Sequence, residues 1–389
     1  MILKHGLHLA YCTNIHRSET WAETFAALES ATLRVKARVQ PHGRYAIGLR
    51  LSDRASRELS DAPTLLQFQR WLDQHECYVF TINGFPFGQF HDVRVKEQVY
   101  RPDWTDPQRV EYTERLFRLL AQLVPVGMEG SVSTSPGSHK DFITTPEQET
   151  QMRAHFWRLV KFLGDLSEKS NRQLHLGVEP EPFGWFENTA ETVQFFERLR
   201  EDHPGDARLE RYLGVNYDAC HLAVEFEEPA AAIAQFQAHN IRISKIHFSS
   251  ALRFAPTPEA LSQLARFDEP VYLHQVIARK PDGQLVKFRD VAPALQSVAG
   301  RSLSAAEEWR VHFHVPLHWQ PTGALSHTVD HVQGLLRLLQ TQPQLCSHLE
   351  METYTWAVMP EFLHSPDVVD QLVGEYEWTL RELAKHDLR

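Results

Sequence analysis

The chain has 389 residues, of which 42% are hydrophobic and 23% charged, so it is long and apolar enough to bury a large core. Its formal net charge of −10 disfavours nucleic acid and anionic membranes as partners, because a phosphate-binding surface needs a net basic face. The four cysteines form no CxxC pair and the apolar runs suit neither a signal peptide nor a membrane span, so we expect a cytoplasmic protein with reduced thiols and no transmembrane segment.

Short apolar strands alternate with amphipathic helices along the chain. We expect strands at 7–14, 45–52, 77–84, 125–134, 174–182, 212–221, 241–252 and 348–356. Helices are expected at 18–39, 64–76, 106–124, 146–170, 188–201, 229–240 and 366–385. Eight strands in series with helices between them predict a (β/α)8 TIM barrel, whose chemistry lies at the C-terminal ends of the strands. An open doubly wound sheet is the alternative, but no GxGxxG motif follows the first strand, so a dinucleotide site is unsupported.

The largest departure from a plain barrel is the connection before the last strand. Residues 253–347 are irregular in pattern, with a strand-like stretch at 309–319. No interdomain linker or internal repeat is visible. We therefore interpret residues 1–389 as a single TIM-barrel domain in which 253–347 form an elaborated loop over the active face.

Acidic residues and histidines recur where the predicted strands end. The fifth strand ends in Glu179 and Glu181, the sixth in Asp218 and His221, the seventh in His247, and the last carries Glu350 and Glu352. A barrel would direct these groups toward one axis, where carboxylates and an imidazole suit a hard or borderline divalent cation. The histidines His221, His312 and His314 would extend the set to a second or third metal.

Each of these residues also has a simpler explanation. The chain contains 22 histidines, so one histidine near a carboxylate carries little information. Asp218 has the position of a helix cap, and either glutamate of "EPEP" or "EMET" could lie on the solvated rim. The recurrence across four strand ends favours the metal site, since buried carboxylates without partners are costly.

The order "VEPEP", "YDACH", "KIHFS" and "METYTW" resembles the xylose-isomerase-like barrels. That superfamily includes sugar isomerases and epimerases and the endonuclease IV-type enzymes (AP endonuclease family 2). The resemblance implies a divalent metal, Mn²⁺, Zn²⁺, Mg²⁺ or Co²⁺, held by Glu179, Asp218, His247 and Glu352 with His221 beside it. It also implies that Glu179 and Glu352 are catalytic and shuttle a proton on a small polar metabolite. Glu181 and Glu350 stay open as alternative ligands, because residues two apart in a strand share a face.

A narrower resemblance covers nearly the whole chain. The stretches "HLAYCTNIHRSETW", "STSPGSHK", "KIHFSSALR", "FHVPLHW" and "ETYTW" are similar to the bacterial metabolite-traffic proteins of the EboE group. That resemblance implies a role in maturation or export of a secondary metabolite. It also implies partners among the other proteins of the same gene cluster.

The residues leave two alternatives to an isomerase or epimerase, namely a hydrolase and a binding protein. Endonuclease IV-type enzymes place histidines on the third and fourth strands, where this chain has Asn83 and Ser135. A metal-dependent hydrolase is therefore less favoured than an isomerase or epimerase. A metal-dependent binding or carrier component, which holds a metabolite without turnover, is the rival from another class.

Further residues are candidate ligand contacts. Asn14, Arg50 and Asn83 end the first three strands and could hydrogen-bond a polar ligand, although Arg50 could equally pair with a structural carboxylate. His139 and Lys140 in "TSPGSHK" form either an anion seat or a basic loop. Trp185 could wall an aromatic pocket.

Overall fold

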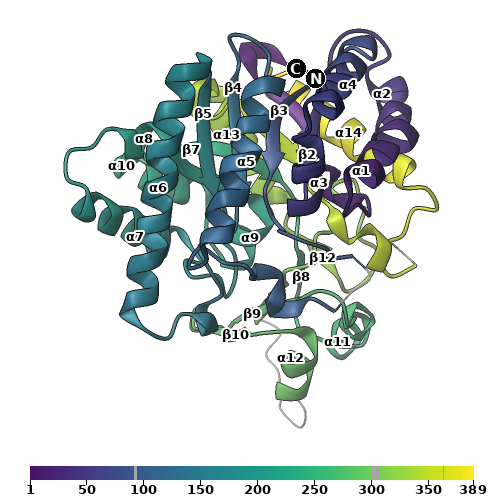
Figure 1. The fold of residues 1–389 in the computed structure, drawn as a ribbon. Helices are drawn as coiled ribbons and strands as arrows, with labels where there is room; N and C mark the ends of the chain where they lie inside the picture. Colours follow the sequence, from purple (N-terminus) through teal and green to yellow (C-terminus); the bar gives the residue numbers. More distant parts are fainter. Residues whose placement is uncertain (92–93, 299–306, 362) are drawn as a thin grey trace.

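A closed sheet of eight parallel strands forms the centre of the computed structural model, which describes residues 1–91, 94–298, 307–361 and 363–389. The strand order is β1-β13-β7-β6-β5-β4-β3-β2, and a parallel bridge between Cys12 and Gly48 joins its two ends. The predicted (β/α)8 barrel is confirmed (Figure 1). Its strands are β1 (His8–Tyr11), β2 (Tyr45–Arg50), β3 (Cys77–Asn83), β4 (Glu129–Thr134), β5 (Gln173–Val178), β6 (Leu213–Asp218), β7 (Arg242–Phe248) and β13 (His348–Met351).

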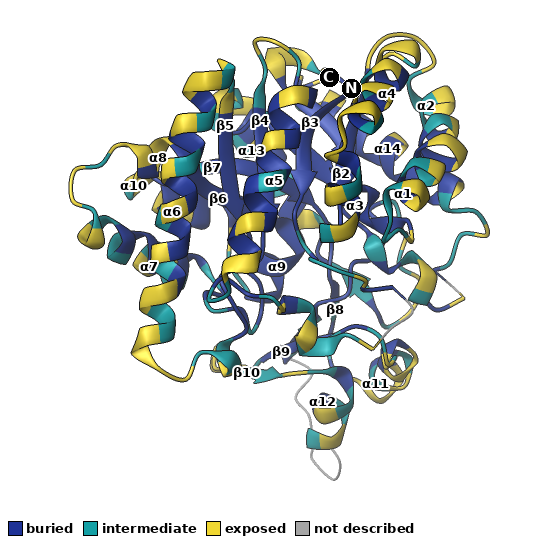
Figure 2. Ribbon diagram, viewed as in Figure 1, coloured by how far each residue is buried: buried dark blue, intermediate teal, exposed yellow. Residues whose placement is uncertain are grey.

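Helices surround the barrel, and most of them expose their outer faces (Figure 2). They are α1 (Trp21–Ala27), α2 (Leu33–Val39), α3 (Asp53–Leu59), α4 (Ala62–Gln74), α5 (Pro107–Leu123), α6 (Pro146–Ser170), α7 (Thr189–Asp202), α8 (Arg208–Tyr212), α9 (Ala219–Val224), α10 (Pro229–Ala238), α13 (Val329–Thr341) and α14 (Val368–Lys385). The helix expected over 18–39 is divided into α1 and α2 by a π-helical turn at Leu28–Thr32. Across the described part of the chain, every helix is too short or too polar to cross a membrane.

Side chains alternate between the two faces of the barrel strands. Along β7, Ile246 packs in the apolar core beneath the helices, whereas Lys245 and His247 contact acidic side chains inside the barrel. Along β13, Leu349 packs outward and Glu350 points inward. The period of two therefore places charged groups from neighbouring strands against each other on the inner face.

Gly48 is needed where the barrel closes. A Cβ at this position would collide with Glu350 Oε1 and with the carbonyl oxygen of Tyr11. Glycine alone lets β2 approach β1 and the Glu350 carboxylate this closely.

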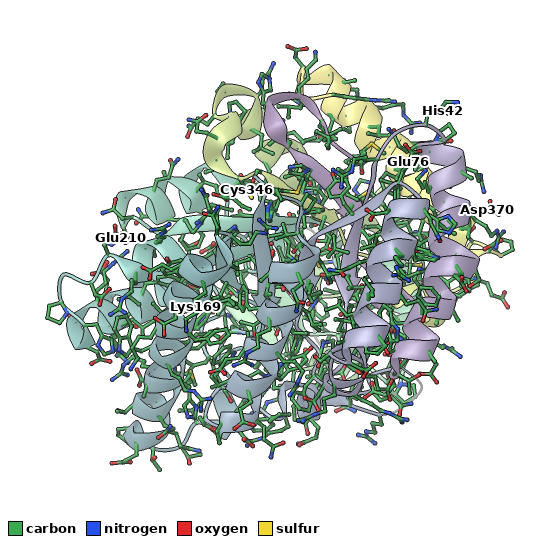
Figure 3. All side chains as sticks on the ribbon, turned by 45° about the horizontal axis from the view of Figure 1, so that its top comes forward. His42, Glu76, Lys169, Glu210, Cys346 and Asp370 are labelled. Carbon is green, nitrogen blue, oxygen red and sulfur yellow. The ribbon has the colours of Figure 1, made fainter. Side chains whose placement is uncertain are left out.

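A second, antiparallel sheet is inserted between β7 and α13, in the order β10-β9-β11-β8-β12. It lies beyond the C-terminal ends of the barrel strands, at the bottom of Figure 1, with α11 and α12. Figure 3 brings the opposite end of the barrel forward, where Glu76 and Cys346 precede β3 and β13. The inserted elements are β8 (Leu252–Phe254), α11 (Pro258–Leu264), β9 (Val276–Arg279), β10 (Leu285–Phe288), α12 (Val291–Ser297), β11 (Glu308–Val311) and β12 (Ser326–His327).

The inserted sheet has its own apolar core, which includes Phe254, Trp309 and Phe313. The stretch 253–347, expected to be an elaborated loop, thus contains most of a folded sheet together with the barrel helix α13. The strand-like pattern at 309–319 corresponds to β11 only at its start, because the chain leaves the sheet after Val311.

Two lysines tie this insertion to the barrel loops. Lys287 Nζ on β10 lies 2.6 Å from Glu187 Oε2 and 2.7 Å from Glu225 Oε2, both in loops that follow barrel strands. Lys96 Nζ lies 2.6 Å from Asp290 Oδ2, which precedes α12. The insertion is therefore attached by ion pairs that are largely shielded from water.

Glu375 on α14 allows a test of the packing between this helix and the barrel. Burial raises the pKa of its carboxyl group to about 7, although Thr353 Oγ1 donates a hydrogen bond to it. A group whose pKa is higher in the folded state contributes stability at low pH and loses it as the pH rises. Glutamine cannot ionise, so Glu375→Gln should not lose this stability. We expect the free energy of unfolding of the variant, relative to that of the wild type, to be higher at pH 8 than at pH 5, by at most roughly 3 kcal/mol.

Urea unfolding of both proteins at the two pH values measures this effect. Glu377→Gln, at an exposed position of the same helix, is the matched control and should show the wild-type pH dependence. An equal effect of Glu375→Gln at both pH values would mean that the carboxyl group is ionised throughout.

Candidate metal centre

Four side chains from neighbouring strands meet at the C-terminal end of the barrel. Glu179 follows β5, Asp218 ends β6, His247 lies near the end of β7, and Glu352 follows β13. One ligand atom from each lies within 4.8 Å of the others, and all four residues are buried. The structure thus brings together the four residues proposed as metal ligands from the sequence.

His247 lies at the middle of this set. Its Nδ1 is 3.1 Å from Glu352 Oε2, 3.2 Å from Glu179 Oε1 and 3.4 Å from Asp218 Oδ2. Its Nε2 lies 2.8 Å from Glu350 Oε2. A hydrogen bond from Nε2–H to that carboxylate leaves Nδ1 as the nitrogen available to a metal.

Each carboxylate has one oxygen held and the other directed toward His247. Asn14 and Asn83 donate to Glu352 Oε1 at 2.8 and 3.1 Å, and Asn216 donates to Glu179 Oε2 at 2.7 Å. For Asp218, Oδ1 accepts from Ser249 Oγ at 2.7 Å and from the backbone N–H of His221 at 2.9 Å.

The other oxygen of Asp218, Oδ2, has no hydrogen-bond donor among the described residues. The remaining oxygens and His247 Nδ1 form an O/O/O/N set with the composition that divalent cations prefer. Asp218 is also the N-cap of α9, because its side chain accepts a hydrogen bond from the backbone N–H of His221. The helix-cap explanation given for this residue from the sequence thus holds beside the proposed ligand role.

The carboxylates change how readily His247 binds a proton. Burial alone would lower its pKa, but the charges of Glu352 and Glu179 raise the pKa well above its ordinary value. We therefore expect metal-free protein to carry a proton on His247 at neutral pH, in the place where a cation would bind.

We expect metal binding at pH 7 to release at least one proton per ion, because Nδ1 must lose its proton to become a ligand. Calorimetric titration with Mn²⁺ in two buffers of different ionisation enthalpy measures that number. Identical heats in the two buffers would place the ligand nitrogen elsewhere.

Lys245 and Glu350 lie one step deeper in the barrel. Lys245 Nζ is 2.7 Å from Glu350 Oε2 and 2.9 Å from Ser133 Oγ, and both charged side chains are fully buried. Burial opposes ionisation of Glu350, yet Lys245 and the hydrogen bond from His247 lower the pKa of Glu350 to about 2. Glu350 thus orients His247 through Nε2. Of the pair Glu350 and Glu352, it is Glu352 that lies in the four-residue set.

A second group of buried side chains adjoins the first. His314 Nδ1 donates to the backbone carbonyl of Glu352 at 2.8 Å, and His221 Nδ1 donates to that of Pro180 at 3.2 Å. Their Nε2 atoms, left as acceptors, lie 3.3 Å apart. Two facing lone pairs repel unless a proton or a cation lies between them.

Three further ligand sets include these histidines. They are Asp218 with His221 and His314, Glu181 with His221 and His312, and Cys220 with His312 and His314. Burial alone would lower the pKa of His221, but the charges of Asp218 and Glu179 outweigh burial and raise it. The acidic surroundings therefore favour a positive charge at this imidazole. Burial raises the pKa of Glu181 to about 7. By position, Glu181 lies with His221 and His312 in the second group.

A cavity opens above both groups at the barrel mouth. Glu179 and Glu352 line it, as do the predicted candidates Asn14, Asn83, Glu181, His221 and His312. The amides of Asn14 and Asn83 donate to Glu352, so they hold a proposed ligand in place as well as lining the cavity.

The structure places four other candidates away from this cavity, so their positions do not support ligand contact there. Arg50 is buried and donates to the carbonyls of Ser18, Pro86 and Gly88, which holds loops together. Lys140 and Trp185 line a separate hollow beside α6 and α7. Lys140 pairs there with Glu187 and Glu191, so its charge is neutralised.

His139 is the fourth of these candidates. It is buried and accepts a hydrogen bond from the backbone N–H of Asp141 through Nδ1. The "TSPGSHK" loop thus has internal contacts at both His139 and Lys140, and its role as an anion seat stays a prediction.

No family model matches the sequence, and no curated protein matches it. Among solved structures, the chain is similar to a xylose isomerase-like TIM barrel protein from Mycobacterium smegmatis in complex with magnesium, at 12% identity, over 99% of each chain and with a TM-score of 0.54. It is also similar to an L-ribulose 3-epimerase, at 12% identity over 99% of this chain and 96% of that one, with a TM-score of 0.52. The IOLI protein with a binding zinc atom matches at 12% identity over 98% of this chain and 99% of that one, with a TM-score of 0.51. These matches show that the chain shares the (β/α)8 barrel fold of these proteins.

Proposed function

We propose that this protein is a divalent-metal-dependent enzyme of the isomerase or epimerase type that acts on a small polar metabolite. One observation carries the proposal: Glu179, Asp218 and Glu352 each direct an oxygen toward His247 Nδ1, at the floor of a cavity. The solved barrels with magnesium and zinc, and the epimerase, agree with it.

The roles of the residues follow from their contacts. A divalent cation held by these four side chains would polarise a carbonyl and a neighbouring hydroxyl group of the substrate. Glu179 and Glu352 both line the cavity and would take and return a proton at adjacent carbons. The amides of Asn216 and Asn14 donate to these carboxylates and so fix the orientation of each one.

Metal analysis and proton exchange test this proposal. We expect about one Mn²⁺ or Zn²⁺ per chain in protein purified without a polyhistidine tag. Incubation of the metal-loaded protein with a panel of aldoses, ketoses and hydroxyketones in D2O should then introduce deuterium beside a carbonyl, as seen by NMR. Protein that binds metal and ligand without exchange would be a carrier instead, and protein that takes up neither metal would contradict both assignments.

Hydrolysis is the second candidate. The facing Nε2 atoms of His221 and His314 favour it, because they provide ligands for a further cation beside the first. Two or three metal ions per chain, with loss of one in His314→Asn, would support a hydrolase. A single ion that is unaffected by His314→Asn would exclude it.

The biological setting is also a proposal. The similarity to the EboE group suggests a cytoplasmic role in secondary-metabolite maturation or export, with partners encoded in the same gene cluster. Affinity capture with those gene products, compared with unrelated proteins of similar charge, tests the partnership.

A further inference from the structure

We infer that the substrate has one polar, metal-chelating end and an apolar body. The inference rests on the proposed function and concerns the same cavity. It differs from the sugar expected of an ordinary isomerase, and it comes from how polar groups are distributed over the cavity surface.

The cavity floor offers several unfilled polar positions. Ser135 Oγ and His312 Nε2 have no hydrogen-bond partner among the described residues, and both residues line the cavity. Together with the carboxylates of Glu179 and Glu352, they can bind the polar end of a ligand.

The wall opposite the floor is aromatic and aliphatic. Tyr272 and Tyr354 meet edge to face, with their ring centroids 5.4 Å apart, and Phe90 lies 6.1 and 6.3 Å from them. The hydroxyl group of Tyr272 is bonded to His91 Nδ1 at 2.6 Å, so this tyrosine presents its ring rather than its hydroxyl. Further apolar lining comes from Phe85, Pro86, Val95, Val99 and Leu273.

Two polar side chains in the wall are already engaged, and among the wall hydroxyl groups that of Tyr100 has no hydrogen-bond partner in the described part of the chain. Lys96 Nζ donates to the carbonyls of Glu269 and Tyr272 and to the Asp290 carboxylate, which uses all three of its N–H groups. Gln275 donates to the carbonyl of Pro182 and accepts from His312 Nδ1.

A substrate with hydroxyl groups along its whole length would therefore leave several of them unpaired against this wall, which costs affinity. An apolar body would instead gain affinity by leaving water and by contacting the rings. The contacts favour a ligand that is polar at the floor and apolar at the wall.

Three ketones with the same head test this inference. Hydroxyacetone, D-xylulose and 2-hydroxyacetophenone share a hydroxymethyl ketone but carry a methyl, a polyhydroxylated and a phenyl body. Calorimetry with the Mn²⁺-loaded protein should give at least tenfold tighter binding for the phenyl compound than for either other ketone. Leu273→Ser, in the wall, should remove most of that advantage, whereas Leu285→Ser, at an exposed position of β10, should leave it unchanged.

The outcomes separate this inference from the proposed function. Equal or tighter binding of D-xylulose would overturn the inference and leave the metal site standing, as would a phenyl preference that survives Leu273→Ser. A phenyl preference that needs no metal would support the wall assignment and contradict the proposed function. If no ketone binds, benzyl alcohol and glycerol replace them, and equal affinity for the two overturns the inference.

Discussion

Glu352→Gln is expected to weaken Mn²⁺ binding at least a hundredfold and to abolish deuterium exchange, while the barrel still folds. The amide removes one of three negative charges around His247 Nδ1, and Asn14 and Asn83 no longer face a carboxylate. Loss of a mere hydrogen-bond partner of a ligand costs about 10–100-fold in affinity, so loss of a ligand charge should cost more. Calorimetry and elemental analysis measure the metal, and circular dichroism the fold.

Glu181→Gln is the matched control, since Glu181 lines the same cavity but lies outside the four-residue set. We expect it to retain the metal. The comparison also decides between the glutamates of each pair, which the sequence leaves open. If Glu352→Gln retained the metal and Glu181→Gln lost it, the metal site would instead be the set of Glu181, His221 and His312.

Lys245→Met is expected to cost about 3–5 kcal/mol in the free energy of unfolding, because it leaves the buried Glu350 carboxylate without its ammonium partner and with His247 as its remaining cationic contact. Urea unfolding of the metal-free variant measures this loss. The double variant Lys245→Met with Glu350→Leu should recover much of it, since apolar residues often replace a buried ion pair at little cost.

Lys4→Met is the control for that experiment. Lys4 pairs with Asp387 at the surface, where solvent screens both charges, so its loss should have little effect on stability. A similar small effect of Lys245→Met would show that water reaches Glu350 inside the barrel.

Much of the fold could be predicted because its strands are regular. Buried apolar runs end in polar residues, and that pattern identifies both the strands and the end of the barrel where Glu179, Asp218, His247 and Glu352 meet. The inserted sheet was not predicted because its strands are two to four residues long, too short to show a period.

Among the site residues that were missed, Lys245 and Asn216 are inner-face residues within a strand rather than at its end. Lys245 stands two residues before His247 in "RISKIHF", and Asn216 stands two residues before Asp218 in "LGVNYD". Spacing by two from a proposed ligand was the available signal, since it places both residues on one face. Arg50 shows the converse: it ends a strand as the ligands do, but the carbonyls that it binds come from distant loops and cannot be read from spacing.

The separate core of the inserted sheet has an evolutionary consequence. Tyr272, Leu273 and His312 reach the cavity from a unit whose apolar interior is distinct from that of the barrel. Mutations within this unit can therefore reshape its share of the cavity wall without disturbing the strands that position the charged groups. Descendants of one ancestral barrel could diverge in specificity by drift within this insertion while their chemistry stays the same.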